Sequence, residues 1–326
     1  MRGDRSSDAP RLANLLGRMK TLVTGGAGFI GSNLVDALVN RGDEVAIVDD
    51  ISTGRRVNLE HALSNGAELI ELDIRDAQAV ADAFARVKPE VVFHLAAQID
   101  VRKSVADPAN DSRVNVEGTI NVLNAANASG VRRLVNTSTG GAIYGEGQII
   151  PAPEEHPVAP ESPYGLSKFC AENYCALFTR LHGLSTISLR YGNVYGPRQD
   201  PLGEAGVIAI FCGMLLEGGR PKIFGDGTQT RDYVYVGDVV DANLRAADSD
   251  ATGSYNVGRG VQTSVLDIVA ALAAQSDNGF EADHAPARTG EVQHIALDPS
   301  RTKAELGWEA QVDLDQGLAR TLDSLR

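Results

Sequence analysis

Cysteine, tryptophan and positive charge are all scarce in this sequence. Its 326 residues include three cysteines, one tryptophan, and 30 Lys and Arg against 43 Asp and Glu, which gives a formal net charge of −13 at pH 7. Binding to nucleic acid needs clustered Lys and Arg, so this balance argues against a nucleic-acid partner. The cysteines, Cys170, Cys175 and Cys212, show no paired spacing. We therefore predict reduced thiols and a cytoplasmic protein.

Long apolar runs are also missing, so no segment is expected to span a bilayer or to make a membrane partner. Residues 1–18 lack the apolar stretch of a secretory signal, and we expect them to form an extension without ordered structure. The histidines have no metal-ligand spacing, so no metal is predicted. We interpret His94 as a structural residue.

Apolar segments of strand length alternate with segments of helical periodicity through the first half of the chain. The expected strands are Lys20–Thr24, Glu44–Asp49, Ala67–Asp73, Val91–Leu95 and Arg133–Ser138. Helical periodicity covers Phe29–Val39, Ala77–Arg86 and Val114–Ala126. Because the strands are apolar throughout, both faces of their sheet are expected to be covered by helices. The pattern predicts an α/β fold with a Rossmann-type, doubly wound parallel sheet.

The second half carries many Pro- and Gly-containing loops, and the chain exceeds the usual size of one hydrophobic core. We therefore predict a smaller α+β domain at the C-terminal side. Residues 19–188, with a return segment at about 232–252, are assigned to the first domain. The second domain is assigned residues 189–231 and 253–326.

A glycine-rich segment, TGGAGFIG at Thr24–Gly31, follows the first strand and begins the first helix. Its glycines fit two spacings, G-x-G-x-x-G from Gly26 or G-x-x-G-x-x-G from Gly25, and both are typical of a turn that holds a pyrophosphate on a helix N-terminus. Asp49 ends the second strand, where an acid can accept hydrogen bonds from both ribose hydroxyls of NAD. Asp50 would repel a 2′-phosphate, so NAD is favoured over NADP. Arg55 and Arg56 lie further along the chain. They could attract such a phosphate, or they could be surface charges.

A Tyr-x-x-x-Lys pattern at Tyr164 and Lys168 is a candidate catalytic pair, since residues four apart share one face of a helix. A free tyrosine titrates near a pKa of about 10. We expect Lys168 and the positive charge of NAD to lower the pKa of Tyr164, which makes it a usable base at neutral pH.

Together these segments resemble the extended short-chain dehydrogenase/reductase family, and the resemblance runs from Met19 to the C-terminus. Within that family the sequence is similar to the UDP-hexose 4-epimerases. The motifs that carry it are TGGAGFIGSNLV, LDIRD, HLAAQ, VNVEGT, STGGAIYGE, SPYGLSK, LRYGNVYGPRQ, FGDGTQTRDYVYVGDV and LDPSRTKAELGW. The resemblance implies that Tyr164 takes the proton of the sugar 4-hydroxyl while C4 passes a hydride to the nicotinamide. The 4-keto sugar then rotates, and hydride and proton return to the opposite face.

The resemblance also implies which residues bind the two ligands. Asp73 and Ile74 would hold the adenine, and Asn115 would lie near Lys168. The cofactor-binding residues implied are Gly25, Gly28, Phe29, Ile30, Gly31, Asp49, Asp50, Asp73, Ile74, Leu95, Ala96, Ala97, Asn115, Tyr164 and Lys168. Those implied for a UDP-sugar are Thr139, Tyr164, Asn193, Arg231, Arg288 and Ile295.

One of these substrate residues also has a physical argument of its own, and for another the resemblance implies a specific role. A guanidinium suits a diphosphate, so Arg231 is a natural ligand for UDP; the alternative is a surface ion pair with Asp232 or Asp226. Ile295 aligns with a position that often gates the N-acetyl group of larger sugars, and isoleucine there leaves the breadth of substrates open.

The sequence departs from the family at the third catalytic residue, a Ser or Thr after the fifth strand. Counting back four residues from Tyr144 gives Gly140, which has no hydroxyl. If one glycine is inserted, the position falls on Thr139, which also lies 25 residues before Tyr164. We predict that Thr139 bonds the sugar 4-oxygen, with Ser138 as the second candidate.

The reaction class is narrowed by missing acids. Related dehydratases and decarboxylases carry a carboxylate where this chain has Ala142 or Gly140, and we interpret Glu146 as a loop acid. This favours epimerisation. Other readings are an epimerase of UDP-glucuronate, UDP-N-acetylhexosamine or a GDP- or dTDP-sugar, a dehydratase or decarboxylase, and a non-catalytic NAD-binding regulator.

The resemblance also implies a homodimer formed through the helices expected at 107–129 and 164–182. The second helix has an apolar stripe that could serve either this interface or the core. Its members are Ala171, Tyr174, Cys175 and Phe178.

Overall fold

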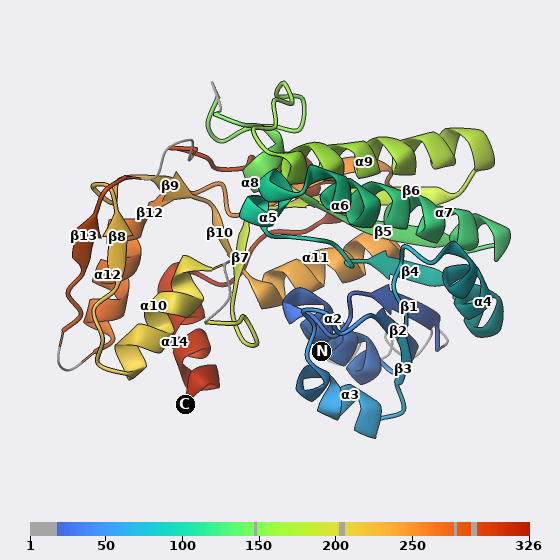
Figure 1. Ribbon diagram of the computed structural model, residues 1–326, viewed down its shortest axis with the longest axis horizontal. Helices are drawn as coiled ribbons and strands as arrows, with labels where there is room; N and C mark the ends of the chain where they lie inside the picture. Colours follow the sequence, from blue (N-terminus) through green and yellow to red (C-terminus); the bar gives the residue numbers. More distant parts are fainter. Residues whose placement is uncertain (1–17, 147–148, 202–205, 277–278, 288–291) are drawn as a thin grey trace, which may run out of the picture.

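The computed structural model describes residues 18–146, 149–201, 206–276, 279–287 and 292–326. Its centre is a seven-stranded sheet in the order β11-β6-β5-β4-β1-β2-β3 (Figure 1). Every neighbouring pair is parallel. The strands are β1 (Lys20–Thr24), β2 (Glu44–Asp49), β3 (Glu68–Glu71), β4 (Val91–His94), β5 (Arg133–Thr139), β6 (Ser185–Tyr191) and β11 (Gly253–Val257). The order reverses between β1 and β4, which is where doubly wound sheets bind their ligands.

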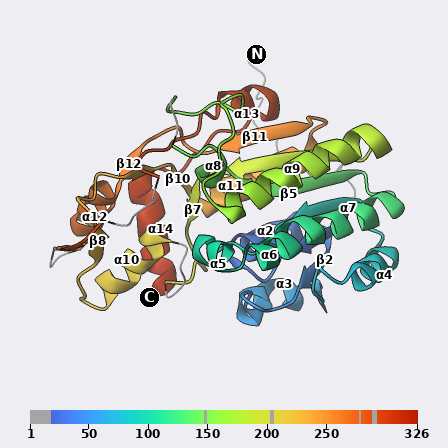
Figure 2. The same cartoon turned by 45° about the horizontal axis from the view of Figure 1, so that its top comes forward.

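Helices cover both faces of this sheet, as the apolar strands predict (Figure 2). One face carries α4 (Ala77–Val87), α7 (Gly118–Ala128) and α9 (Pro163–His182), whose side chains share one buried cluster. The other face carries α2 (Phe29–Arg41) and α11 (Val236–Asp248), with α3 (Glu60–Ser64) and α13 (Ser300–Leu306) beside them. The predicted fold class is confirmed.

Short helices follow the carboxyl ends of the strands and position the site. They are η1 (Arg56–Leu59), α5 (Val101–Ala106), α6 (Pro108–Ser112), the π-helical turn η2 (Arg113–Glu117) and α8 (Gly140–Ile143). A π-helical turn is rare and is often found at functional sites. Here η2 joins α6 to α7 directly beside α9.

The smaller part lies at the left of Figure 1. It pairs β7 (Asn193–Tyr195) with β10 (Tyr233–Tyr235), β8 (Lys222–Phe224) with β13 (Asp283–Ala285), and β9 (Thr230–Arg231) with β12 (Thr263–Ser264). Three helices, α10 (Val207–Leu216), α12 (Val265–Ala274) and α14 (Leu314–Leu325), pack around a core of their own. Phe29 and Ile30 of α2 also pack against this core, so the helix after the glycine turn touches both parts.

The observed bounds of β6 and β11 differ from the domain boundaries that we expected from the sequence. The predicted division after residue 188 cuts through β6, and residues 253–257, which we assigned to the second domain, form the seventh strand of the large sheet beside β6. A strand belongs to the sheet whose ladder it completes, so β11 is assigned to the first part. The division into two domains is still our own proposal, and residues 1–17 lie outside the described chain.

The three cysteines are free thiols, and two of them, Cys175 and Cys212, are buried. Of the helices that the structure describes, none has the length and apolar character needed to cross a bilayer.

Candidate active site

The glycine turn joins β1 to α2, and its glycines are required by close packing. A Cβ on Gly25, whose φ is +70°, would lie 2.6 Å from the backbone nitrogen of Ala96, and one on Gly31 would lie 2.1 Å from the carbonyl oxygen of Gly25. Gly28 is the N-cap of α2 and provides no side-chain cap. The start of the helix is therefore bare backbone, which suits an anionic pyrophosphate.

Asp49 lies at the end of β2 and supports this turn. Its Oδ2 accepts a hydrogen bond from the Ala27 N–H at 2.9 Å, and its Oδ1 accepts one from the Ile51 N–H at 2.9 Å. Burial raises the pKa of Asp49, and these hydrogen bonds oppose the rise. Its neighbour Asp50 is exposed and accepts hydrogen bonds from the backbone and hydroxyl of Ser52.

The other predicted cofactor residues follow β3 and β4. The Asp73 carboxylate is paired with the Arg75 guanidinium, whose hydrogen bonds lower the pKa of Asp73. Ile74 is buried, and a Cβ on Gly118 would lie 2.6 Å from its Cδ1. The partly buried segment Leu95–Ala97 follows β4 and contacts the glycine turn. Of the two arginines after β2, Arg56 forms an exposed ion pair with Glu71, in agreement with a surface charge.

Tyr164 and Lys168 lie on the first two turns of α9. Ser162 caps this helix by accepting a hydrogen bond from the Gly165 N–H at 3.1 Å, and Pro163 occupies its first turn. Tyr164 therefore lies at the positive end of the helix dipole, which favours a phenolate. Lys168 is buried at 3% exposure.

The expected lowering of the Tyr164 pKa is not seen in this chain. Burial raises the pKa of Tyr164 to about 12, a hydrogen bond with Thr139 opposes the rise, and the charge of Asp111 adds to it. Burial lowers the pKa of Lys168 to about 8, while Cys175, Glu172 and Asp111 act to raise it. Our prediction neglected the cost of placing a phenolate in a buried site. The cofactor's positive charge would have to offset that cost.

The structure separates the two candidate hydroxyls. The side chain of Thr139 forms a hydrogen bond with Tyr164, whereas the Ser138 Oγ is buried without a hydrogen-bond partner. A Cβ on Gly140 would lie 2.4 Å from Cδ1 of Leu297, so a serine at the position found by simple counting would require the Leu297 side chain to shift. The geometry therefore favours Thr139.

Asn115 does not contact Lys168 through any described hydrogen bond. It lies in the η2 turn, and its Nδ2 is within 3.2 Å of the Ser167 Oγ and 3.1 Å of Asp111 Oδ1. Sequence analysis missed both of these partners. Ser167 is part of the SPYGLSK motif and could have been found there; no pattern marks Asp111.

His94, interpreted as structural, is buried and binds two threonine hydroxyls. Its Nδ1 lies 2.7 Å from the Thr24 hydroxyl and its Nε2 lies 2.9 Å from that of Thr119. Burial lowers the pKa of His94 to about 3, and the positive charge of Lys168 lowers it further, so the imidazole is neutral.

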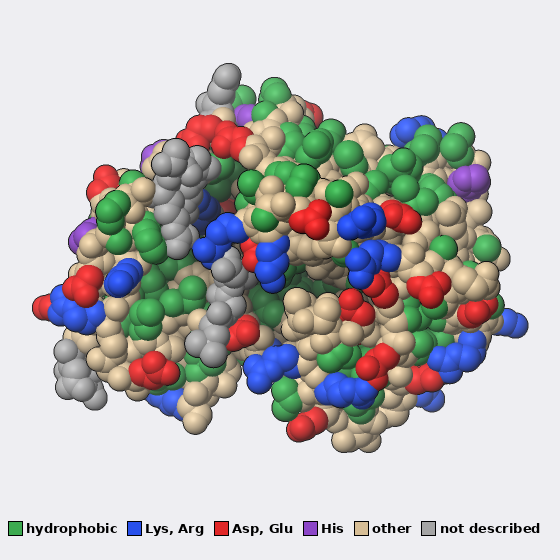
Figure 3. Space-filling view, in the orientation of Figure 1, with side chains coloured by type: hydrophobic (Ala, Val, Ile, Leu, Met, Phe, Trp, Pro, Cys, Tyr) green, Lys and Arg blue, Asp and Glu red, His purple; other side chains and the backbone are tan. Residues whose placement is uncertain are grey.

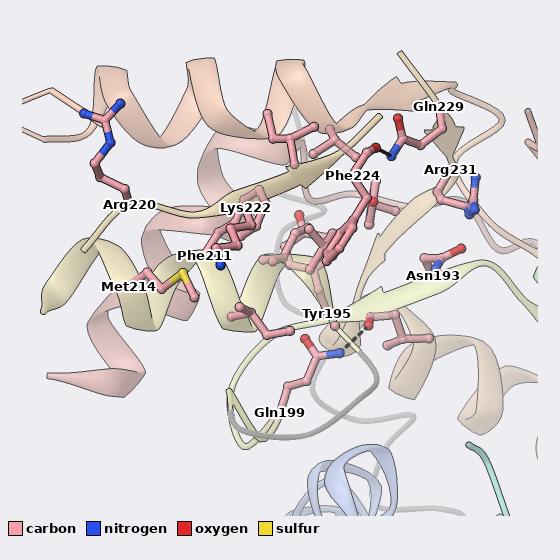
Figure 4. Close-up of a pocket in the computed structure, with 18 of the residues that line it drawn as sticks. Asn193, Tyr195, Gln199, Phe211, Met214, Arg220, Lys222, Phe224, Gln229 and Arg231 are labelled. Atoms are coloured by element: carbon pink, nitrogen blue, oxygen red, sulfur yellow. Dashed lines mark hydrogen bonds between the residues drawn. The ribbon is translucent and has the colours of Figure 1, made fainter. Parts of the chain in front are cut away.

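A cavity of about 640 Å³ is lined mainly by residues of the smaller part (Figure 4), and Arg102 of α5 also borders it. This volume is in the usual range for small-ligand sites. In the close-up, Asn193 and Arg231 lie near each other at one end, and Arg220 lies at the other. The lining also includes Arg102, Tyr195, Lys222, Phe224 and Gln229. In the space-filling view, Lys and Arg side chains gather around a hollow between the two parts (Figure 3).

Asn193 connects this cavity to the candidate catalytic residues. A Cβ on Gly141 would lie 3.4 Å from Oδ1 of Asn193 and 4.0 Å from the hydroxyl oxygen of Thr139, so the two side chains flank this glycine. Arg231 donates a hydrogen bond to the carbonyl of Thr230 at 2.9 Å. The Asp232 carboxylate accepts hydrogen bonds from three backbone N–H groups instead, those of Arg259, Gly260 and Leu297.

The structure does not bring Ile295 into the cavity lining. The side chain is 2% exposed and packs in a small apolar cluster with Ile143, Tyr144 and Leu297. Arg288, the remaining predicted substrate residue, lies outside the described residues. Glu146 accepts a hydrogen bond from the Gln293 N–H at 2.8 Å, as a loop acid would.

Comparisons with known proteins place the chain among similar sequences and structures. The model of the NAD dependent epimerase/dehydratase family matches residues 21–258. The chain is 47% identical over 310 residues to the UDP-glucose 4-epimerase of Mycolicibacterium smegmatis, covering 94% of this chain and 99% of that protein. A structure of UDP-glucose 4-epimerase with UDP-glucose from Thermotoga maritima is 44% identical, with a TM-score of 0.91 over 94% of this chain and 99% of that one. A structure of the Thermus thermophilus UDP-glucose 4-epimerase with NAD is 43% identical, with a TM-score of 0.88 and the same coverage of both chains.

Proposed function

Since the chain belongs to the NAD dependent epimerase/dehydratase family, we propose that it inverts C4 of a UDP-hexose and interconverts UDP-galactose and UDP-glucose. The observation that carries this proposal is the hydrogen bond between Thr139 and Tyr164, which lies on the same helix face as Lys168, with no carboxylate at positions 140 and 142. Elimination or decarboxylation would need an acid there, so simple epimerisation fits the site better.

The residues present suit NAD. An added Cβ at Gly25 or Gly31 would collide with the backbone of Ala96 or Gly25, so the tight turn before α2 needs glycine at these positions. The N-terminus of α2 has no side-chain cap, and Asp49 lies at the strand end where ribose hydroxyls are expected. When bound, NAD supplies the group that takes up a hydride from C4 and gives it back.

Tyr164 would perform the proton transfer at the sugar 4-oxygen. As a phenolate it accepts the 4-hydroxyl proton, and after the sugar has turned over it returns that proton, so no net proton is consumed. The N-terminus of α9 favours the phenolate by its positive charge, and Lys168 and bound NAD would together have to offset the burial of Tyr164. The Thr139 hydroxyl, bonded to Tyr164, would align the same oxygen of the sugar.

The nucleotide would lie in the cavity of the smaller part. Arg231 and Asn193 line the end of this cavity, with Asn193 nearer to Thr139. A guanidinium offers paired donors to a diphosphate, and Phe224 offers an aromatic face for a base.

We also propose a homodimer. The stripe of α9 that we considered is unavailable, because Ala171, Cys175 and Phe178 are buried in the chain's own core. Two other apolar side chains of α9 are exposed, Leu166 at 53% and Leu181 at 66%. A second copy of the chain would cover these side chains. Light scattering of the purified protein would measure its mass in solution and so test for the dimer.

We also infer a cytoplasmic location, because the cysteines are free thiols.

One experiment tests the proposed reaction. The purified protein is expected to carry NAD and to interconvert UDP-galactose and UDP-glucose without added cofactor. UDP-N-acetylgalactosamine and UDP-galacturonate, assayed alongside, measure the breadth of substrates. Absence of turnover on all of them, in protein shown to contain NAD, would exclude the epimerase proposal.

A further inference from the structure

The buried carboxylate of Asp111 lies behind the candidate catalytic pair and has no part in the reaction described so far. It is 1% exposed and belongs to α6, which packs beside η2 and α9. Both of its oxygens accept hydrogen bonds. Gln98 Nε2 donates at 2.8 Å and Asn115 Nδ2 at 3.1 Å to Oδ1, and the Ser167 hydroxyl donates at 2.7 Å to Oδ2.

All three donors of Asp111 are neutral, although a buried carboxylate normally needs a nearby cation. Arg190 is not available, because it forms a buried ion pair with Glu172 at 2.7 Å. The cations of α5, Arg102 and Lys103, are exposed. Among the described residues packed around α6, the buried cation that remains is Lys168.

Asp111 is also tied mechanically to the catalytic face of α9. Ser167 stands between Tyr164 and Lys168 in sequence, and its hydroxyl contacts both the Asp111 carboxylate and the Tyr164 carbonyl oxygen at 3.1 Å. Asn115 bonds Asp111 and Ser167 together. The position of this turn of α9 is therefore set from α6 and η2.

We propose that Asp111 is a positioning residue of this active site, which fixes Ser167 and Asn115 behind the catalytic turn of α9 and adds a buried negative charge to the surroundings of Lys168. This proposal rests on the proposed function, since it assigns Asp111 a part in the same proton transfer. The charge of Asp111 acts to raise the pKa of both Tyr164 and Lys168.

Cys175 and Glu172 of α9 also act to raise the pKa of Lys168, so Asp111 shares this effect with them. On α9 itself, Glu172 is held by Arg190, and burial raises the pKa of the Cys175 thiol to about 12, which keeps it neutral. On β4, His94 is neutral, and on β5, Thr139 carries no charge.

The test compares Asp111→Asn with Ser167→Ala. Asp111→Asn removes the charge and replaces one accepting oxygen by an NH2 group, so one hydrogen bond is lost as well. The loss of charge lowers both pKa values, and both limbs of the kcat–pH profile move to lower pH, by about half a unit or more. Ser167→Ala removes one hydrogen bond of Asp111 and keeps its charge, so kcat falls while the limbs stay in place. If Asp111→Asn leaves both limbs where the parent enzyme has them, the proposal is overturned.

A stability measurement tests the same coupling without relying on activity. Thermal unfolding, with excess NAD, is measured for Asp111→Asn, Lys168→Met and the double variant. Each single change leaves one buried charge without its partner, so the double variant is expected to lose less stability than the two singles added together. Additive losses would overturn the charge coupling. If the parent protein proves inactive, the proposed function fails while this cycle still decides on Asp111 and Lys168.

Discussion

Replacing Thr139 by alanine tests the least conventional feature of the site, a catalytic hydroxyl placed one residue before the expected position. Thr139 ends β5, and its side chain makes no capping hydrogen bond to α8, so the change leaves the local backbone supported. What is lost is the hydrogen bond to Tyr164 and the donor proposed for the sugar 4-oxygen. The expected effect therefore falls on turnover rather than on folding.

The size of the effect follows from the role of the hydroxyl. Losing a donor to an oxygen that gains charge in the transition state costs about 10²–10³ in kcat. Because the bond with Thr139 opposes the rise of the Tyr164 pKa, its loss raises that pKa further. The acid limb of the kcat–pH profile then moves to higher pH, the direction opposite to that expected for Asp111→Asn.

Two matched variants control this experiment. Thr139→Ser keeps the hydroxyl and is expected to retain most of the activity. Ser138→Ala removes a buried oxygen that has no hydrogen-bond partner, so its activity stays near that of the parent and its stability does not fall. Rates are measured by separating UDP-galactose from UDP-glucose after timed reactions. The assignment is refuted if Thr139→Ala stays within threefold of the parent, or if Ser138→Ala loses more activity than Thr139→Ala.

Three further changes probe the same site. Tyr164→Phe should abolish turnover while the protein still carries NAD, and an active variant would show that another group is the base. Gly140→Ser should destabilise the protein by about 1–3 kcal/mol, because its Cβ would overlap Leu297, and Leu297→Ala in the same chain should recover part of the loss in thermal unfolding. Glu172→Gln should cost about 3–5 kcal/mol in denaturant unfolding by leaving Arg190 buried without its partner; a cost below about 1 kcal/mol would contradict the burial argument.

The parts of the site that sequence analysis predicted are those fixed by local spacing. The glycine turn, the acid at the end of β2 and the pair on α9 each depend on a few neighbouring residues whose geometry is set by one strand end or one helix. Asp73 shows the limit of this reasoning. It follows β3 as expected, but its carboxylate is held by Arg75, only two residues further along the chain.

The parts that were missed depend on contacts between distant segments. Leu297 packs against Gly140, and nothing near Gly140 in the sequence reveals that contact. In the sequence, Asp111 cannot be distinguished from any other acid of a short helix, because its contact with α9 exists only in the folded chain. Likewise β11 joins the large sheet through pairing with β6, more than 60 residues earlier, and its short sequence alone does not reveal that pairing.

The buried hydrogen bonds of His94 show how the two ends of the site are joined. The Thr119 hydroxyl donates to the carbonyl of Asn115 at 2.7 Å, so it must accept from His94 Nε2–H. The other ring nitrogen then accepts from the hydroxyl of Thr24, the first residue of the glycine turn. This fixes the neutral tautomer and links the glycine turn to Asn115, and through it to the catalytic turn of α9. A protonated imidazole would donate from both ring nitrogens, so it could no longer accept the hydrogen bond from Thr24, and it would place a second positive charge near Lys168. The lowered pKa of His94 keeps the imidazole neutral and so avoids both effects.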